Sequence, residues 1–557
     1  MSVSSPFWPP LLTKRLYYPE IPLFRMVEIS AEYYPRNTAL NYYGREISYR
    51  ELTQGIDSLA GSLQRRGVKK GERVAVYTQN SPHFIISFFA AMKAGAVVVP
   101  LNPMLRSSEL TYMLKDSGAE RLISTAELLP NIQEAASAEE VELKNVIVGN
   151  YSDYLPQAPL TDVPDLVKSV NNDAVKQAGY ELWSEVLEEN QSLQEVELSP
   201  DDLCLLPYTS GSTGVPKGCM HTHRTILSNV LSAFYWMSMT PASVHLSALP
   251  YFHVTGLVHN VLAPLYAGAS LVVLTRWNRT AALDLIEKLQ CTHWINITAM
   301  VIDLLNEEEL SQRNLTSLLV VGGGGAPLPK AVGEHLKQVT GLDYIEGYGL
   351  TETISQTHFN PPQRPKLQCI GIPDFEVDAR IVDVETLQEL EANQEGELVI
   401  NGPEVFKGYW NMPQETEKSF TELEGKSFFR TGDICYRDEE GYFFIVDRTK
   451  RMINAAGFKI WPAEVENKLY QNPNVMEACV VGVPDAKRGE EARAYVVLKP
   501  DSQGKVSEEE IIQWCSQQMA AYKYPRQIVF VDSLPKSSTG KVLWKDLQDQ
   551  AKKEVEE

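Results

Sequence analysis

Hydrophobic and polar positions alternate along the first hundred residues in a way that predicts helices and strands in turn. Residues 48–67 carry apolar side chains at helical spacing, and residues 73–77 (RVAVY) form a short run typical of a strand. Residues 84–94 are apolar on nearly every side, which predicts a buried helix, and residues 96–99 predict another strand. This alternation indicates a parallel sheet that is covered by helices.

The same rhythm returns further along the chain and then changes. Short apolar runs at residues 203–207, 270–274 and 318–321 predict further strands. The stretch from 130 to 200 is polar and acidic, and we interpret it as connecting and surface structure without a functional site. From about residue 396 the pattern becomes one of short strands separated by turns.

Length and charge divide the chain into parts. The 557 residues exceed what a single hydrophobic core organises, so at least two domains are expected. Residues 450–557 carry 16 basic and 16 acidic side chains, so the whole net charge of −21 lies in the residues before them. We therefore predict an acidic N-terminal domain over residues 1–449 and a neutral C-terminal domain over residues 450–557.

Charge and composition also exclude several classes of protein. A net charge of −21 argues against a bulk basic surface for nucleic acid or anionic membranes. The longest apolar run, residues 84–92, is about half as long as a membrane-spanning helix, and the N-terminus does not look like a secretory signal. The seven cysteines include no C-x-x-C pair, which makes a zinc site or a disulfide framework unexpected and favours a reducing cytoplasm.

The strongest local signal is the segment YTSGSTGVPKG at residues 208–218. Its glycines allow tight backbone turns, its hydroxyl groups can donate hydrogen bonds, and Lys217 adds a cation, so it can cradle phosphate oxygens. Composition alone supports a flexible polar loop equally well. The spacing differs from that of a Walker A loop here and at Gly540-Lys541, which excludes a P-loop NTPase.

Three further clusters carry chemically useful side chains. In GYGLTE (347–352), Tyr348 can lie on a nucleobase and Glu352 can hold Mg²⁺. In FRTGD (429–433), Asp433 can accept both ribose hydroxyls, and PKSSTGK ends with Lys541. Each cluster taken alone is more simply interpreted as a surface turn.

Taken in order, these motifs point to one family. YTSGSTGVPKG, LPYFHVTG, GYGLTE, FRTGD, DRTKRMINAAGFKIWPAEVE and PKSSTGK together resemble the adenylate-forming superfamily of acyl-CoA synthetases, firefly-type luciferases and peptide-synthetase adenylation domains. The resemblance covers about residues 20 to 550. It implies an α/β fold: a large N-terminal domain of layered α/β sheets with a small β-barrel-like part, and a smaller, mobile α+β C-terminal domain.

The resemblance also implies a reaction and its site. In such enzymes a carboxylate attacks the α-phosphate of ATP, pyrophosphate leaves, and a thiol such as that of CoA attacks the acyl-adenylate. The loop from Thr209 to Lys217 is expected on the β- and γ-phosphates, and Glu352 on Mg²⁺. The remaining nucleotide-binding residues implied are Ser210, Gly211, Ser212, Thr213 and Gly214 in that loop, Thr351 on phosphate, Asp433 and Arg448 on ribose, and Gly324, Gly325, Ala326, Pro327 and Tyr348 around adenine.

Other roles follow from the same resemblance. Lys541 matches the lysine that bridges the carboxylate and the phosphoester oxygens in the first step, and Lys450 matches the pivot of the C-terminal domain. Residues 455–461, which include Gly457, are expected to form the thiol channel. His253 matches a histidine beside the acyl carboxylate, with a core or helix-capping histidine as the alternative.

Three residues are expected to lack a role that their position suggests. His221 and His223 follow the phosphate loop, but we expect no catalytic role for them. Asn454 stands where luciferase-type members often carry lysine, which argues against oxidative light chemistry.

The acid and its acceptor are predicted from the expected acyl pocket. It lies between residues 253–257, residues 298–303 and the glycines 322–325, whose missing side chains leave room for a chain. No arginine for a second carboxylate is evident, so we predict a medium- to long-chain fatty acid. We expect CoA as the acceptor, because we see no appended carrier-protein domain after residue 550. An aryl acid, an acyl-carrier protein as acceptor, and an inactive nucleotide-binding regulator are the alternatives. The sequence leaves the oligomeric state open, with a homodimer and transient membrane contact among the options, and it predicts no nucleic acid partner.

Overall fold

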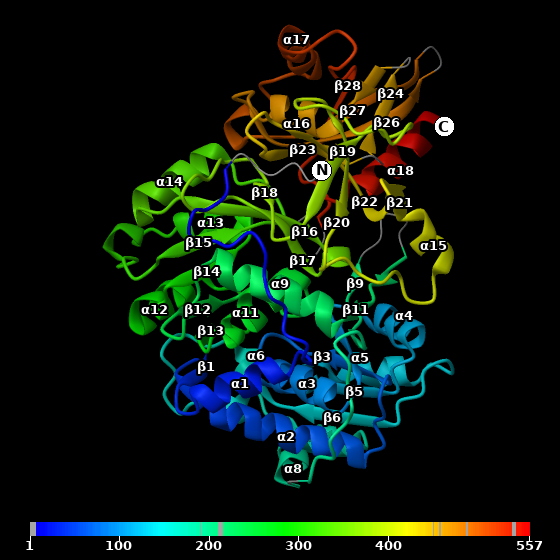
Figure 1. Cartoon of the computed structure of the whole chain (residues 1–557). Helices are drawn as coiled ribbons and strands as arrows, with labels where there is room; N and C mark the ends of the chain where they lie inside the picture. The colour runs from blue at the N-terminus through cyan, green and yellow to red at the C-terminus, as the bar shows by residue number, and fades with distance from the viewer. Residues whose placement is uncertain are drawn as a thin grey trace. The chain divides into compact units, whose positions relative to one another are not determined.

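The computed structural model describes residues 7–189, 191–209, 215–448, 451–455, 458–485, 488–536 and 542–556 (Figure 1). The chain forms two compact units, each of which is described by itself. Unit 1 consists of Met1–Ala379, Ile400–Phe429 and Glu440–Tyr442, and unit 2 of Arg380–Val399, Arg430–Glu439 and Phe443–Glu557.

The first sheet of unit 1 has seven strands in the order β11-β8-β4-β3-β5-β6-β7. All neighbours are parallel except β11, which runs antiparallel to β8. Every residue of β4 and β5 is buried, as in parallel sheets that are covered on both faces. The strands are β3 Arg73–Tyr77, β4 Val97–Leu101, β5 Arg121–Thr125, β6 Asn145–Gly149, β7 Glu181–Leu182, β8 Leu203–Leu205 and β11 His221–Thr222.

The helices beside this sheet confirm the predicted pattern. Helix α2 (Tyr49–Arg65) begins after Ser48, whose hydroxyl accepts a hydrogen bond from the backbone N–H of Glu51. Helix α3 (Pro82–Lys93) is buried from Pro82 to Met92, which agrees with its apolar sequence. The two helices pack against each other.

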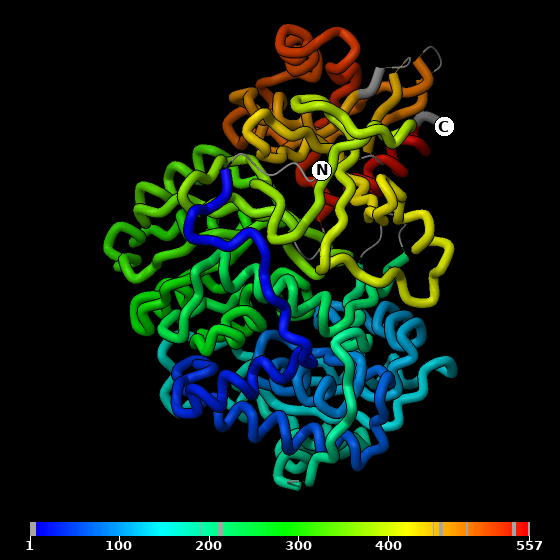
Figure 2. The backbone as a smooth tube through the Cα atoms, viewed as in Figure 1, coloured from blue at the N-terminus to red at the C-terminus, as the bar shows by residue number. Residues whose placement is uncertain are grey.

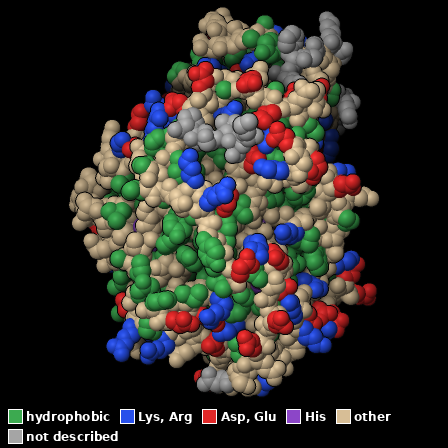
Figure 3. Space-filling model, viewed as in Figure 1, with side chains coloured by type: hydrophobic (Ala, Val, Ile, Leu, Met, Phe, Trp, Pro, Cys, Tyr) green, Lys and Arg blue, Asp and Glu red, His purple; other side chains and the backbone are tan. Residues whose placement is uncertain are grey.

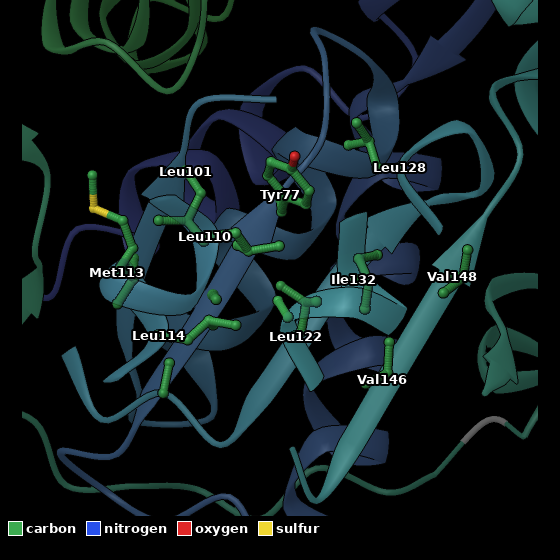
Figure 4. Close-up of a cluster of buried hydrophobic side chains, with 14 of the residues drawn as sticks. Tyr77, Leu101, Leu110, Met113, Leu114, Leu122, Leu128, Ile132, Val146 and Val148 are labelled. Atoms are coloured by element: carbon green, nitrogen blue, oxygen red, sulfur yellow. The ribbon is translucent and has the colours of Figure 1, made fainter. Parts of the chain in front are cut away.

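Helices α4 (Ser107–Ser117) and α5 (Leu129–Ala136) contribute to a core beside this sheet (Figure 4). Val146 and Val148 of β6 belong to that core. The interpretation of residues 130–200 as connecting and surface structure is therefore wrong for β6, whose few apolar residues do not stand out among polar neighbours. Other members are Tyr77, Leu101, Leu110, Met113, Leu114, Leu122, Leu128 and Ile132.

The second sheet of unit 1 has nine strands in the order β18-β17-β16-β15-β14-β12-β13-β1-β2. Its centre is parallel, and its two edges end in antiparallel pairs. The strands are β1 Thr38–Tyr42, β2 Arg45–Ser48, β12 Val244–Ser247, β13 Ser270–Val273, β14 His293–Asn296, β15 Val320–Gly323, β16 Tyr344–Leu350, β17 Ser355–Phe359 and β18 Ile372–Pro373.

Unit 1 also contains further helices, most of which lie in the chain between these strands. They are α1 Arg25–Tyr33, α9 His223–Trp236, α10 Val254–Leu257, the π-helix η3 Val258–Leu262, α11 Ala263–Tyr266, α12 Arg279–Leu289, α13 Thr298–Leu305, α14 Lys330–Thr340 and α15 Pro413–Lys418.

The N-terminal segment of unit 1 is attached by its own side chains, and Figure 2 shows it as an extended blue trace. The indole of Trp8 packs edge-on against Trp236, at 5.4 Å between ring centroids, and against Phe375, at 5.3 Å. Further along, the backbone N–H of Leu23 donates to Nδ1 of His223 at 3.1 Å in a buried position.

The later part of the chain contains two smaller sheets. One has the order β19-β20-β22-β21, with β23 paired to β22. The other has the order β25-β24-β27-β26, with β28 added in parallel to β27. The strands are β19 Asp378–Val382, β20 Gly396–Asn401, β21 Phe420–Leu423, β22 Lys426–Arg437, β23 Phe443–Arg448, β24 Ile453–Ala455, β25 Phe458–Ile460, β26 Val475–Asp485, β27 Gly489–Leu498 and β28 Gln527–Phe530.

Helices α16 (Pro462–Leu469), α17 (Glu508–Gln518) and α18 (Trp544–Glu556) complete the C-terminal part. The predicted fold class is confirmed: several mixed α/β sheets form a large N-terminal part, and a smaller α+β part follows. The domain boundary at 449/450 stays a prediction, because both residues lie outside the described residues. Within the described ranges, no helix is long and apolar enough to cross a membrane.

Candidate active site

Lys217 begins the second strand of a short hairpin in unit 1. Strands β9 (Tyr208–Thr209) and β10 (Lys217–Gly218) pair antiparallel, with Lys217 opposite Thr209. The connecting residues Ser210, Gly211, Ser212, Thr213 and Gly214 lie outside the described residues. The Lys217 ammonium donates to Oε2 of Glu415 at 2.6 Å, and only 12% of its side chain is exposed.

Glu352 lies at a sharp corner between β16 and β17. Gly349 permits that corner, because a Cβ there would stand 1.5 Å from the carbonyl oxygen of Ser355. The 3₁₀ turn η5 (Thr351–Thr353) follows, and the hydroxyl of Tyr409 donates to Oε1 of Glu352 at 2.8 Å. The carbonyl of Thr351 accepts a 2.8 Å hydrogen bond from Nε2 of His221.

The segment 406–410 joins these two places. The backbone N–H of Phe406 donates to the carbonyl of Glu352 at 2.8 Å. Two residues on, Gly408 accepts from Met220 at 3.0 Å, and Trp410 donates to Gly218 at 2.8 Å. Lys217 and Glu352, which are far apart in the sequence, are therefore connected through one short stretch of backbone.

Tyr409 and Glu415 are the site residues that sequence reasoning missed. Both belong to unit 1, and both contact a residue that the motifs singled out. Their segment, NGPEVFKGYWNMPQE, contains ordinary turn and helix-start residues and carries no local signal for phosphate or metal chemistry.

The residues expected around adenine lie together on neighbouring strands. Gly323 of β15 pairs with Glu346 of β16, and a Cβ on Gly324 would stand 2.5 Å from the carbonyl oxygen of Gly347. Gly325, Ala326 and Pro327 are exposed, whereas Tyr348 is buried with 9% of its surface accessible and lies edge-on to His358. This close approach explains why glycine occupies position 324.

Of the four glycines 322–325, only Gly325 leaves the open space that the sequence predicts, because a Cβ there would meet nothing nearer than Cγ2 of Ile297 at 3.9 Å. A Cβ on Gly323 would stand 1.9 Å from the carbonyl oxygen of Asn296 and 2.6 Å from the hydroxyl of Tyr344. A Cβ on Gly322 would stand 2.5 Å from the carbonyl oxygen of Ile345. The missing side chains are therefore replaced by close packing of neighbouring strands.

Of the three histidines that the motifs single out, one is exposed and two are buried. His253 is exposed and caps α10, with its Nδ1 accepting from the backbone N–H of Thr255 at 3.4 Å. His221 and His223 are buried, and burial lowers the pKa of each to about 4. Each makes the backbone contact given above.

In unit 2, Asp433 and Arg448 stand opposite each other on β22 and β23. Nε of Arg448 lies 2.9 Å from Oδ1 of Asp433, whose side chain is 3% exposed against 49% for the arginine. Asp447, which precedes Arg448, accepts from the backbone N–H of Ala463 at 2.6 Å, and burial raises its pKa. Lys450, Gly457 and Lys541 lie outside the described residues.

The electrostatics of the unit 1 site favour fixed charges. Hydrogen bonds from Lys217 and Lys418 lower the pKa of Glu415, so its carboxylate stays ionised. Burial, followed by the nearby Glu352 carboxylate, raises the pKa of Tyr409 well above its ordinary value, so its hydroxyl stays protonated as a donor.

On the face drawn in Figure 3, basic and acidic side chains are interspersed.

A magnesium ion fits Glu352 when it arrives with phosphate. Among the residues described here, no group of three or more histidine, cysteine, aspartate or glutamate side chains is placed to hold a metal. Mg²⁺ commonly uses one or two carboxylates and takes its other ligands from water and substrate phosphates. A carboxylate held by the Tyr409 hydroxyl matches that donor set.

Known proteins resemble this chain over nearly its whole length. The sequence matches the family described as AMP-binding enzyme over residues 27–410, and the AMP-binding enzyme C-terminal domain over residues 464–541. A long-chain-fatty-acid–CoA ligase of Bacillus subtilis (strain 168) is 34% identical over 532 residues, which is 94% of this chain and 93% of that protein.

Two further similarities extend this comparison. A feruloyl-CoA synthase of Amycolatopsis sp is 32% identical over 515 residues, covering 91% of this chain and 95% of that protein. The crystal structure of ATP-bound MatB from Rhodopseudomonas palustris has a TM-score of 0.83 and 28% identity, covering 96% of this chain and 99% of that one.

Proposed function

The chain belongs to the AMP-binding enzymes, and on this premise we propose that it uses ATP to join a medium- to long-chain fatty acid to CoA. Membership confirms the resemblance inferred from the motifs. The protein is an acid–thiol ligase of the AMP-forming type, and its products are an acyl-CoA, AMP and pyrophosphate.

The reaction has two half-reactions. First, a carboxylate oxygen of the acid attacks the α-phosphorus of ATP, the bond to the bridging oxygen breaks, and pyrophosphate leaves. Then the CoA thiol attacks the acyl carbon of the acyl-adenylate and AMP leaves. Both reactants of the first step are anions, so positive charge must be concentrated where they meet.

One observation carries the proposal. Lys217 and Glu352, the predicted phosphate cation and magnesium carboxylate, are both in contact with Tyr409. Both belong to unit 1, which also holds Tyr348 and the Gly324–Pro327 turn. Although the net charge of the protein is −21, the largely buried Lys217 supplies a positive charge beside Tyr409.

We assign the remaining roles by the same reasoning. Lys217 binds the β- and γ-phosphates with the loop that begins at Thr209, and Thr351 contacts phosphate. Tyr348 and residues 324–327 bind adenine, and Asp433 with Arg448 binds ribose. Glu352 would hold Mg²⁺, which when bound neutralises phosphate charge. His253 lies beside the acyl carboxylate, Lys541 bridges carboxylate and phosphoester in the first step, and Gly457 lies in the thiol channel.

The choice of acid rests on the apolar residues near the predicted pocket. Leu257 is buried in α10, and Met300 and Val301 are buried in α13. The similarity to a long-chain-fatty-acid–CoA ligase supports a fatty acid. The similarity to a feruloyl-CoA synthase favours an aryl acid as the second candidate.

We also propose a location and partners. All seven cysteines are buried free thiols, which suits the reducing cytoplasm. A homodimer, transient contact with a membrane surface and an acyl-carrier protein as alternative acceptor stay predictions.

Product mass spectrometry tests the proposal. Purified protein is incubated with ATP, Mg²⁺ and acids from acetate to oleate, with ferulate added to the panel, with and without CoA. The proposal requires AMP and acyl-CoA from fatty acids of medium to long chain. Turnover of ferulate alone would establish the aryl alternative, adenylate without acyl-CoA would indicate a carrier protein, and ATP binding without turnover would indicate a regulator.

A further inference from the structure

Tyr409 contacts two oppositely charged side chains at once. Its ring centroid lies 5.0 Å from the Lys217 ammonium nitrogen, and its hydroxyl lies 2.8 Å from Oε1 of Glu352. The face of an aromatic ring attracts a cation, and a phenol hydroxyl donates to a carboxylate. One buried side chain therefore satisfies a cation on its face and an anion at its tip.

The ion pair that Lys217 forms is with Glu415 and not with the carboxylate at the other end of Tyr409. Nζ of Lys217 lies 2.6 Å from Oε2 of Glu415, which stands in the first turn of α15. Lys418 lies 3.2 Å from the other carboxylate oxygen. Glu415 thus binds the lysine from a position near solvent, with 37% of its side chain exposed.

The scaffold around Tyr409 is built to hold this arrangement. Cys219, Phe406, Tyr409 and Phe429 form a buried cluster. The backbone N–H of Tyr409 donates to Oγ1 of Thr416 at 2.9 Å, one residue after Glu415. Gly408, whose φ of +129° suits glycine, lets the chain pass Thr416, since a Cβ would stand 2.5 Å from its Cγ2. Tyr409 and α15 are therefore fixed relative to each other.

We propose that Tyr409 and Glu415 are positioning residues that keep Lys217 and Glu352 from pairing with each other before MgATP binds. This inference rests on the proposed function, in which the lysine serves phosphate and the glutamate serves the cation. Opposite charges that meet in a low-dielectric site would otherwise neutralise each other. The Tyr409 hydroxyl holds the Glu352 carboxylate, and Glu415 gives the lysine an exchangeable partner that phosphate oxygens can replace.

Two substitutions test each half of the arrangement. Glu415→Gln removes the partner charge of Lys217 at a half-exposed position, so the fold is retained. Tyr409→Phe keeps the ring and removes the hydroxyl that binds Glu352. Lys418→Gln is the matched control, because it changes charge in the same short helix and its side chain is 72% exposed.

The measurement is the affinity for ATP by isothermal titration calorimetry, once with Mg²⁺ and once with EDTA. The dissociation constant measured with EDTA, divided by the constant measured with Mg²⁺, reports how strongly Mg²⁺ promotes ATP binding, independently of turnover. We expect Glu415→Gln and Tyr409→Phe to lower this ratio at least about fivefold, because Lys217 then competes for Glu352. Lys418→Gln should leave it within about twofold of the wild type.

The outcomes separate this inference from the proposed function. If the wild type binds MgATP more tightly than ATP and both variants keep that ratio, the positioning role is wrong while the function stands. If the wild type does not bind ATP, the proposed function fails and this inference with it. Thermal melts of all variants identify any general loss of fold, which would alter both dissociation constants alike and leave their ratio unchanged.

Discussion

Asp433 and Arg448 form an ion pair across two antiparallel strands, with Nε of the arginine 2.9 Å from Oδ1 of the aspartate. The aspartate is nearly buried and the arginine is half exposed. The strand pair thus presents a carboxylate whose orientation is fixed by its neighbour. A fixed carboxylate can accept two hydroxyl groups of a ribose.

Asp433→Asn is therefore expected to weaken ATP binding. Hydrogen bonds to a charged group contribute about 1.5–3 kcal/mol, so the KM for ATP should rise about tenfold or more. Steady-state kinetics with varied ATP checks this, with the exposed Asp532→Asn as control. A KM for ATP equal to that of the wild type would remove Asp433 from the ribose site.

Lys217→Ala is expected to abolish most of the first half-reaction. Removing a charged donor from a phosphate site commonly costs about 100-fold or more in rate. Pyrophosphate release with acid and ATP, before CoA is added, measures this step directly. Lys418→Ala, which removes a lysine from the same surroundings, should stay within about threefold of the wild type. Comparable losses in both variants would show that net charge, and not Lys217, matters.

Gly323→Ala is expected to destabilise unit 1. The new methyl group would have to displace the backbone carbonyl of Asn296, which lies 1.9 Å from its position, and overpacking of this kind costs about 1–3 kcal/mol or more. Gly55→Ala in α2 is the control, because its methyl group would meet the flexible end of Ile86 at 3.4 Å.

Gly55→Ala should raise stability by up to about 1 kcal/mol, since alanine favours a helix over glycine. Chemical denaturation followed by circular dichroism compares the two variants. An unchanged unfolding midpoint in Gly323→Ala would show that β14 and β15 can separate without cost.

Acid is expected to destabilise the protein through its buried histidines. Burial lowers the pKa of His223 from 6.5 to about 4, so the folded state stays neutral there while the unfolded chain takes up a proton. The contribution of neutral His223 to the free energy of unfolding is fully present above pH 6.5 and is lost as the pH falls from 6.5 towards 4. His221 and His259 behave alike, because burial lowers the pKa of each to about 4.

His223→Asn tests that sign. An asparagine oxygen can accept the N–H of Leu23 as Nδ1 does, and it does not titrate. The melting temperature of the variant should therefore fall less between pH 7.5 and pH 5 than that of the wild type. Equal falls would mean that His223 is protonated in the folded state or contributes nothing to acid sensitivity.

The sequence predicts the parts of this molecule whose signals are local. Strands β3 and β4 and helix α3 can be predicted because elements that are buried on both sides have almost continuous apolar runs. Lys217 and Glu352 can be recognised as candidate site residues because their motifs combine glycine, hydroxyl and charged residues at close spacing. Strand β6 is not, because its short apolar stretch resembles many surface segments.

Contacts between distant residues could not be predicted in this way. Glu415 and Lys217 are 198 residues apart, and nothing in either segment indicates the other. The sequence predicts open space at the glycines of β15, but the neighbouring strands fill that space. Glycine in a strand permits close approach, and only the tertiary structure tells whether a ligand or another strand makes it.

The interleaving of the two units has a consequence for synthesis on the ribosome. Unit 1 includes Ile400–Phe429 and Glu440–Tyr442, which are separated from its first segment by a stretch that belongs to unit 2. A nascent chain that has reached residue 380 already contains Lys217 and Glu352 but lacks Tyr409 and Glu415. Unit 1 can therefore close only after residue 442 has emerged, and a product truncated near residue 380 would be an unfinished fold in which Cys219 lacks the aromatic residues 406, 409 and 429 that cover it.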